Sequence, residues 1–241
     1  MSAGRPLNVV VTGGSGPSGI ATARALREAG HSVFTVGSHG PRIGAAAAEA
    51  GDGVVPLTCD LASLPDVRAL HATISGRAGR VDGVIHLVGG WRGASGITDQ
   101  TDEDWDFLER GAITTLRNVT RVFYDDLAAS GTGRFAMVTS TAVATPTAAG
   151  ASYVAAKAAA EAWTLAVAEG FSTEPRSGSG EQHSAAVIFV VRGLVDPGMR
   201  AKSPDRSFPG YTDVADLAAA AVGLFTAPAA ELNGQRLLLS R

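Results

Sequence analysis

VVVTGGSGPSGIATARAL, residues 9–26, joins an apolar run to a glycine-rich turn and then to an Ala/Leu/Ile-rich segment. The apolar run predicts a buried strand, and the apolar spacing within 20–26 predicts a helix that begins directly after the turn. Gly13, Gly16 and Gly19 have no Cβ, so the amides of the turn can approach a pyrophosphate at the positive end of that helix. The stretch therefore predicts a dinucleotide site, although any tight strand-to-helix connection can use glycine.

The rest of the chain alternates short apolar runs with longer segments rich in Ala, Leu, Arg and Glu, the order of βαβ units. Several runs are almost continuously apolar, which is typical of parallel strands covered by helices on both faces. We expect strands at Leu7–Thr12, Ser32–Val36, Gly53–Cys59, Gly83–Val88, Arg134–Thr139, Ala185–Val191 and Arg236–Leu239. We expect helices at Ser18–Ala29, Ile43–Ala50, Leu64–Gly76, Asp102–Ala129, Ser152–Phe171 and Thr212–Phe225. The predicted fold class is α/β, with a Rossmann-type, doubly wound, mainly parallel seven-stranded sheet in three αβα layers.

Composition bounds the class of protein. The 241 residues are 45% hydrophobic, enough to bury one substantial core, so we expect a single domain over 1–241. The net charge of -3, without a Lys/Arg run, gives no electrostatic footprint for nucleic acid or an anionic membrane. Cys59 is the one cysteine, and the first residues lack the apolar stretch of a signal peptide or membrane span. We expect a cytoplasmic protein that binds neither nucleic acid nor membrane.

The end of the second predicted strand reads VGSHGPR, residues 36–42. A carboxylate at this place would accept hydrogen bonds from the ribose 2′-hydroxyl of NAD, but the stretch holds no acidic residue. Ser38 can donate to a 2′-phosphate and Arg42 can pair with it. These two residues favour NADP(H) over NAD(H), and His39 is expected to contact the cofactor beside them. The alternative that these residues only turn the chain stays open.

Tyr153 and Lys157 are four residues apart on a predicted helix, so they share one face and can act on one ligand. Lysine is rare in this chain, and Lys202 is its one other copy. An ammonium about 4 Å from the phenol, at an effective dielectric near 20, would lower the pKa of Tyr153 by about three units. We expect Tyr153 to act as a general acid or base and Lys157 to hold ribose hydroxyls; an exposed helix pair is the alternative.

Three hydroxyl residues, Thr139, Ser140 and Thr141, end the fifth predicted strand. The carboxyl end of such a strand faces the crevice in which open α/β sheets bind ligands. We predict that Ser140 holds a substrate oxygen near Tyr153; a hydroxyl that only caps the strand is the alternative.

Five features carry weaker predictions. His86 is expected to be a hydrogen-bonded interior histidine, and Trp91 and Trp105 are expected either in a pocket wall or in the core. Residues 172–184 are polar and rich in Gly, Ser and Pro, which predicts an extended surface loop. Residues 192–209 contain three prolines and are expected to form a flexible flap over the ligand crevice.

Taken together, TGGSGPSG at Thr12–Gly19, CDL at Cys59–Leu61, Ser140 and YVAAK at Tyr153–Lys157 resemble the short-chain dehydrogenase/reductase family along nearly the whole chain. In that family the matching Ser orients the substrate, the Tyr and Lys carry proton transfer, and a nicotinamide cofactor delivers hydride. The resemblance implies Asp60 beside the adenine, and a homodimer or homotetramer joined through the long helices that begin near Asp102 and Ser152. It also implies cofactor contacts from Ser15, Ile20, Leu61, Val88, Gly89, Gly90, Tyr153, Lys157, Gly193 and Val195.

The chain departs from that family's pattern at three places. The usual NNAG reads LVGG here, at Leu87–Gly90, which keeps the glycine geometry and loses polar side chains. Ala112 lies where the family has its catalytic Asn; Thr115 is the better substitute, because Asn118 lies about 240° around the helix. The family has PG after the sixth strand, whereas this chain has RG at Arg192 and Gly193. Arg192 is therefore expected to bind an anionic or carbonyl-rich substrate.

These motifs predict an NADP-dependent ketoreductase that reduces a carbonyl, or oxidises the alcohol, of a small molecule. GGW at Gly89–Trp91 and MRAKSPDRSFPGYT at Met199–Thr212 resemble dihydropteridine reductase, so an imine or quinonoid substrate stays open. Ala112 and the lost NNAG polarity keep open an NADP-binding regulator with little or no catalysis. The sequence holds no HExxH, paired CxxC, GxSxG or P-loop, so we expect no metal site.

Overall fold

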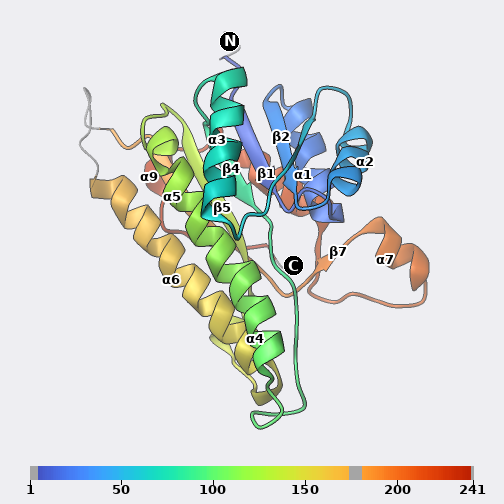
Figure 1. Cartoon of the computed structure of the whole chain (residues 1–241). Helices are drawn as coiled ribbons and strands as arrows, with labels where there is room; N and C mark the ends of the chain where they lie inside the picture. The colour runs from blue at the N-terminus through green and yellow to red at the C-terminus, as the bar shows by residue number, and fades with distance from the viewer. Residues whose placement is uncertain (1–4, 174–180, 240–241) are drawn as a thin grey trace.

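A parallel seven-stranded sheet lies at the centre of the protein, of which a computed structural model describes residues 5–173 and 181–239 (Figure 1). The strands lie in the order β3-β2-β1-β4-β5-β6-β9, and each is parallel to its neighbour. Their bounds are β1 (Asn8–Thr12), β2 (Ser32–Gly37), β3 (Val55–Thr58), β4 (Gly83–His86), β5 (Gly133–Ser140), β6 (Ser184–Val191) and β9 (Arg236–Leu238). The order reverses between β1 and β4, the switch point at which open α/β sheets bind ligands.

Each face of the sheet is covered by its own set of helices. Val9 and Val11 of β1 belong to a buried cluster with residues of α1, α2 and α8, whereas Val10 belongs to a cluster with residues of α3, α5 and α6. The helix bounds are α1 (Pro17–Glu28), α2 (Gly40–Ala50), α3 (Leu64–Ala78), α5 (Thr115–Ala128), α6 (Ala151–Thr173) and α8 (Val214–Gly223). A strand buried on both faces is apolar at every position, which explains the run VVV. The predicted αβα fold class is confirmed.

The long helix predicted over Asp102–Ala129 is interrupted. It consists of α4 (Asp102–Glu109), a π-helical turn η1 (Arg110–Thr114) and α5. The Thr115 hydroxyl donates to the Gly111 carbonyl at 2.7 Å, a side-chain bond that competes with the backbone pattern of the helix. The expectation of one continuous α-helix is therefore wrong at its centre, and π-turns of this kind are frequent at functional sites.

The segment after β6 contains regular structure. Its elements are β7 (Leu194–Val195), α7 (Pro197–Lys202) and β8 (Thr212–Asp213), and β7 pairs in parallel with β8. Figure 1 shows α7 projecting away from the sheet. The helix predicted from Thr212 instead begins after Asp213, whose side chain accepts from the Ala215 amide as the N-cap of α8.

Three further short elements lie outside the sequence prediction: η2 (Thr141–Ala144), η3 (Ala148–Gly150) and α9 (Ala229–Leu232). Of the predicted surface loop over 172–184, residues 174–180 lie outside the described residues, and Ser172 still belongs to α6.

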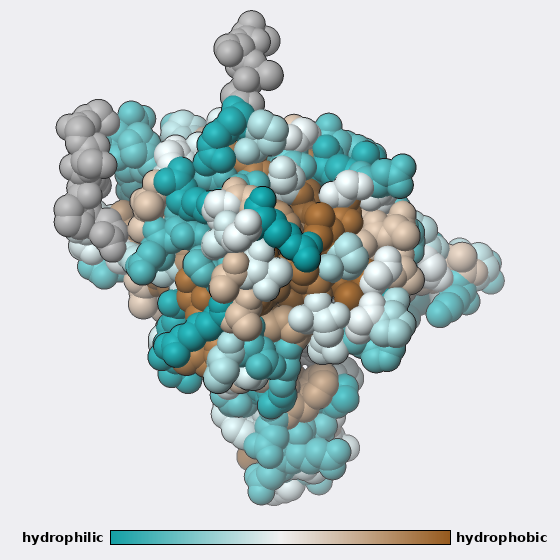
Figure 2. Space-filling model, turned by 45° about the horizontal axis from the view of Figure 1, so that its top comes forward, coloured by the Kyte–Doolittle hydropathy of each residue, from teal (hydrophilic) through white to brown (hydrophobic). Residues whose placement is uncertain are grey.

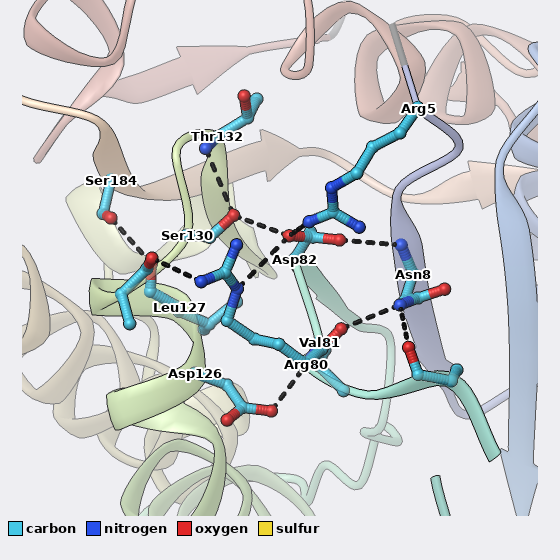
Figure 3. A network of polar contacts seen from close by, with 12 residues as sticks. Arg5, Asn8, Arg80, Val81, Asp82, Asp126, Leu127, Ser130, Thr132 and Ser184 are labelled. Atoms are coloured by element: carbon cyan, nitrogen blue, oxygen red, sulfur yellow. Dashed lines mark hydrogen bonds and ion pairs between the residues drawn. The ribbon is translucent and has the colours of Figure 1, made fainter. Parts of the chain in front are cut away.

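Asp82 forms the centre of a buried polar network at the amino ends of the strands (Figure 3). Its fully buried carboxylate accepts hydrogen bonds from Arg5 Nη2 (2.7 Å), Ser130 Oγ (2.7 Å) and the Asn8 amide (3.0 Å). A buried carboxylate is tolerated when its oxygens are paired in this way. The network therefore fixes the end of the sheet that lies opposite the carboxyl ends of the strands.

The surface seen in Figure 2 is mostly hydrophilic or neutral, and hydrophobic residues show mainly in its recesses. Trp91 is 67% exposed and Trp105 is 38% exposed, so the alternative that they belong to the core is wrong. Within the described part of the chain, every helix is too short or too polar to cross a bilayer.

Candidate active site

A cavity of about 620 Å³ opens at the carboxyl ends of β1, β2, β3 and β4. Its volume lies within the range of about 300–1,000 Å³ that is usual for small-molecule and cofactor sites. The predicted cofactor residues that line it are Gly13, Ser15, Gly16, Ser38, His39, Arg42, Asp60, Leu61, Val88 and Gly89. The structure thus gathers residues from four strand ends around one space.

The glycine-rich turn is shaped by close backbone contacts. Gly13 has φ +73°, and a Cβ on it would lie 2.8 Å from the carbonyl carbon and oxygen of Leu87. A Cβ on Gly19 would lie 2.6 Å from the Gly13 carbonyl oxygen, so Gly19 closes the turn onto α1 without lining the cavity. The Ile20 amide donates to the carbonyl of Gly16, the N-cap of α1 (2.9 Å). The turn forms a cradle of backbone groups at a helix N-terminus, which fits a pyrophosphate.

The end of β2 supplies polar side chains to the same cavity. His39 Nδ1 accepts from the Arg42 amide (3.3 Å) and caps α2, so this histidine has a structural task there. Ser38 and Arg42 line the cavity with it. A hydroxyl and a guanidinium are the donors that bind phosphate oxygens.

Phe107 of α4 and Arg110 of η1 are among the cavity residues that were not predicted from the sequence. Arg110 Nη2 lies 2.7 Å from Asp60 Oδ2, and Asp60 Oδ1 accepts from the Ala62 amide (3.0 Å). The ion pair joins the loop after β3 to the π-turn. The sequence contains no motif that predicts this ion pair, because the two residues are fifty positions apart and each alone is typical of an exposed charged residue.

The candidate catalytic side chains Ser140, Tyr153 and Lys157 come together at the end of β5 and the start of α6. Ser140 is buried, and its hydroxyl accepts from the Ala142 amide (3.2 Å) and hydrogen-bonds Tyr153. Burial raises the pKa of Tyr153, and the hydrogen bond with Ser140 acts in the opposite direction.

The expected lowering of the Tyr153 pKa by a neighbouring ammonium is wrong for this structure. Lys157 Nζ donates to the Val138 carbonyl (2.9 Å), and burial of the phenol dominates. Lys157 nevertheless borders the cavity, because a Cβ on the lining residue Gly89 would lie 3.2 Å from its Nζ. The cavity and the candidate catalytic group are therefore adjacent.

His86 is a buried, hydrogen-bonded histidine, as predicted. Its Nδ1 lies 2.8 Å from Thr12 Oγ1 and its Nε2 lies 3.2 Å from Thr115 Oγ1. Burial, with a smaller contribution from the positive charge of Lys157, lowers the pKa of His86 to about 3, so the ring is neutral. It connects β1 to the first residue of α5.

Ala112 is buried in a small cluster with Leu108 and Ala156, against which Tyr153 packs. The two polar residues considered as substitutes for the missing Asn are both engaged elsewhere. Thr115 bonds the Gly111 carbonyl and His86, and Asn118 Nδ2 donates to the Leu61 carbonyl (3.0 Å). The contacts of this helix therefore place an apolar surface beside the Tyr153 ring.

The remaining predicted cofactor residues, and Arg192, which was predicted to contact the substrate, pack against other groups. Ile20 packs against the buried cluster that contains Val9 and Val11. A Cβ on Gly90 would lie 2.7 Å from the Phe107 ring, and one on Gly193 would lie 2.7 Å from the Tyr211 ring. Val195 is fully buried in β7. Arg192, directly after β6, is exposed, and its Nη1 donates to the Pro209 carbonyl (3.0 Å). These residues are not among those that line the cavity.

Comparison with known families gives a match over most of the chain. The model of the short chain dehydrogenase family matches residues 7–205. A Mycobacterium tuberculosis protein named (5R,7aS)-5-hydroxy-7a-methyl-1-oxo-2,3,5,6,7,7a-hexahydro-1H-indene-carboxyl-CoA reductase is 35% identical over 118 residues. That match covers 47% of this chain and 45% of the relative, so it spans less than half of either protein.

Solved structures show the same fold. A short chain oxidoreductase from Pseudomonas aeruginosa PAO1, described as containing an atypical catalytic center, superposes with a TM-score of 0.83 at 20% identity. The superposition covers 97% of this chain and 95% of that chain, and the same protein is known with NADPH bound. An NAD+-bound xylitol dehydrogenase superposes with a TM-score of 0.80 at 19% identity, covering 97% of each chain.

Proposed function

The chain belongs to the short-chain dehydrogenase family, and from this we propose that it is an NAD(P)-dependent oxidoreductase acting on a carbonyl group or the corresponding alcohol. One observation carries the proposal: the cavity built on the Gly13–Gly19 turn ends at Gly89, against the Lys157 ammonium. A nicotinamide dinucleotide would fit this arrangement, with its pyrophosphate on the glycine-rich turn and its nicotinamide near Lys157. The Mycobacterium relative, named as a reductase, supports the same reaction class.

The residues present fit a nicotinamide dinucleotide. Cβ atoms on Gly13 and Gly19 would collide with backbone, so this tight turn requires glycine, and its amides would hold the pyrophosphate. Asp60 and Leu61 line the part of the cavity that the adenine would take, while Val88 and Gly89 lie towards the catalytic group. When bound, the cofactor supplies or accepts the hydride.

Tyr153 is the residue that moves the proton. Because its raised pKa keeps the phenol protonated near neutral pH, it can give its proton to the carbonyl oxygen during reduction. Ser140, hydrogen-bonded to it, holds the same oxygen. Lys157 would hold a ribose hydroxyl of the cofactor through its ammonium. In the alcohol oxidation the proton returns from substrate to phenolate.

NADP(H) is the cofactor we favour. Ser38 and Arg42 line the cavity at the end of β2, where the ribose 2′ substituent lies in this fold. A hydroxyl and a guanidinium can bind a 2′-phosphate, and the segment 36–42 offers no carboxylate for a 2′-hydroxyl. The related structures hold either NADPH or NAD+.

The substrate we favour is a ketone that carries an anionic or second carbonyl group. Arg192 follows the carboxyl end of β6, and its guanidinium is exposed beside the flap carbonyl of Pro209. A guanidinium at that place can bind carboxylate or carbonyl oxygens. Arg192→Ala should raise KM for the best substrate found, and an unchanged KM would remove this part of the proposal.

A panel of ketones, aldehydes and imines with NADPH, followed by the loss of NADPH absorbance, tests the proposed activity. Wild type should turn over at least one carbonyl compound, and Tyr153→Phe should slow it by about 100-fold or more. Equal rates in both proteins would discard the role of Tyr153. Tight NADPH binding with no turnover of any compound would favour the cofactor-binding regulator.

A homodimer or homotetramer joined through the helices beginning at Asp102 and Ala151 is also proposed, on family grounds. Light scattering that gives only monomer mass would contradict it.

A further inference from the structure

The burial of Lys157 poses a problem for the role proposed for its ammonium. The residue is 7% exposed, and burial lowers its pKa from 10.5 to about 8. A lysine that loses its proton above pH 8 can no longer give a ribose hydroxyl a charge-assisted hydrogen bond. A negative charge close to Lys157 would oppose that loss.

Glu161 lies one helical turn beyond Lys157 on the same face of α6. It is also 7% exposed. Its Oε1 accepts from Thr139 Oγ1 of β5 (2.7 Å), and its Oε2 accepts from Arg236 Nε of β9 (2.8 Å). Its negative charge acts on Lys157 and raises the pKa of that lysine. The carboxylate is thus fixed by two strands one helical turn from Lys157, and the two side chains bond consecutive residues of β5, Thr139 and Val138.

The groups on the elements around α6 were compared as sources of a negative charge that could stabilise the Lys157 ammonium. His86, at the end of β4, is neutral, and β5 presents the Val138 carbonyl and the Ser140 hydroxyl. Along the long helix packed against α6, three charged side chains contact other groups: Glu109 bonds Thr114, Arg110 pairs with Asp60, and Arg117 lies over the Trp163 ring. Within the described residues, Glu161 is the acidic group that acts on Lys157.

We propose that Glu161 is a positioning residue that keeps the Lys157 ammonium charged and directed at the cofactor cavity, with Arg236 of the last strand holding the carboxylate in place. Burying a carboxylate is unfavourable unless it is paired, and an apolar side chain would fill the same space at lower cost. The role rests on the proposed function, since it matters through the task given to Lys157. It also extends the site to β9, at the far edge of the sheet.

The pKa of Lys157 can be measured directly by NMR, because the sequence contains two lysines and their signals can be told apart. Protein grown on isotope-labelled lysine gives two side-chain NMR signals, and Lys202→Arg identifies the signal of the exposed Lys202 on α7. Titration without cofactor should give a midpoint near pH 8 for Lys157 in wild type. Glu161→Gln should lower that midpoint by about one pH unit, and Glu161→Asp, which keeps the charge, should lower it less.

The sign of the shift separates this role from a merely structural one. Loosened packing around Lys157 would admit water and raise its midpoint, whereas loss of a compensating charge lowers it. A midpoint that is unchanged or raised in Glu161→Gln would overturn the proposal. If Glu161→Gln does not fold, Glu161→Asp decides: its shorter side chain moves the carboxylate away from the ammonium and should lower the midpoint of Lys157. An unchanged or raised midpoint in Glu161→Asp would contradict the proposal.

NADPH titrations with Lys157→Met distinguish failure of this inference from failure of the proposed function. A lowered Lys157 midpoint in Glu161→Gln, with NADPH binding equally tight in wild type and Lys157→Met, would uphold the charge coupling and reject the cofactor role of Lys157. An unchanged midpoint, with NADPH binding weakened in Lys157→Met, would reject the coupling and uphold the cofactor role.

Discussion

The Lys157 ammonium donates a 2.9 Å hydrogen bond to the Val138 carbonyl, two residues before Ser140 on the same strand. This bond fixes the lysine against the carboxyl end of β5, at the border of the cavity, before any ligand is present. A hydrogen-bonded ammonium is ready to bind ribose hydroxyls, because little side-chain entropy is left to lose.

Lys157→Met and Tyr153→Phe should separate binding from proton transfer. A hydrogen bond from a charged group contributes about 1.5–3 kcal/mol, so Lys157→Met should weaken NADPH binding by about 10- to 100-fold. Tyr153→Phe should leave NADPH affinity nearly unchanged, because its proposed task is to move a proton. Fluorescence titration of NADPH checks both, and equal weakening in the two variants would contradict the division of roles.

Gly19→Ala should damage the cofactor site through backbone crowding. Its Cβ would lie 2.6 Å from Gly13 O, so the turn must shift, which should lower the free energy of unfolding by about 1–3 kcal/mol and abolish tight NADPH binding. Gly44→Ala on α2 is the matched control, since a Cβ there meets open space. It should stabilise by about 0.5–1 kcal/mol and leave binding intact. Urea unfolding and NADPH titration test the pair; similar behaviour of the two variants would contradict the cradle.

Arg42→Ala should discriminate between the two cofactors. Loss of a charge-assisted contact to a 2′-phosphate should weaken NADPH by about 10-fold or more and leave NADH unchanged. Arg24→Ala serves as the arginine control, because Arg24 is exposed on α1 and bonds the Glu49 carbonyl. Comparative titrations of both cofactors decide. A parallel loss of NADPH and NADH affinity in Arg42→Ala would remove the preference for NADP(H).

His86 should make the protein less stable in acid. Its pKa is about 3 in the folded state against 6.5 as the ordinary value, so the unfolded chain takes up more protons between these values. Its contribution is complete above about pH 6.5 and is lost as the pH falls, by about 1.4 kcal/mol per pH unit. His86→Gln lacks this titration, so its stability should fall less than that of wild type between about pH 7 and about pH 5. Urea unfolding at both values measures the difference, and equal losses would contradict a neutral buried His86.

Much of the fold could be predicted because it depends on local patterns. The run VVV at Val9–Val11 signals a strand buried on both faces, and the glycines that follow signal the turn. The short β7–β8 pair and α7 escaped prediction, because two-residue strands carry no periodicity. That residues 1–241 form a single domain stays a prediction.

The sequence predicted which residues form the site better than it predicted their burial, contacts and pKa values. Spacing places Tyr153 and Lys157 on one helix face, but it does not reveal how deeply that face is buried or which carbonyl Lys157 meets. The π-turn around Ala112 interrupts a segment whose residue pattern fits one continuous helix, so the pattern does not reveal it. Contacts such as that between Arg110 and Asp60 join distant segments and need the folded chain.

A crystal structure of the protein with NADP+ tests the central claim most directly. The account predicts the pyrophosphate on the turn from Gly13 to Gly19, the 2′-phosphate beside Arg42, and the nicotinamide facing the Tyr153 hydroxyl with a ribose hydroxyl on Lys157. A cofactor bound elsewhere, or a nicotinamide that points away from Tyr153 and Lys157, would contradict it.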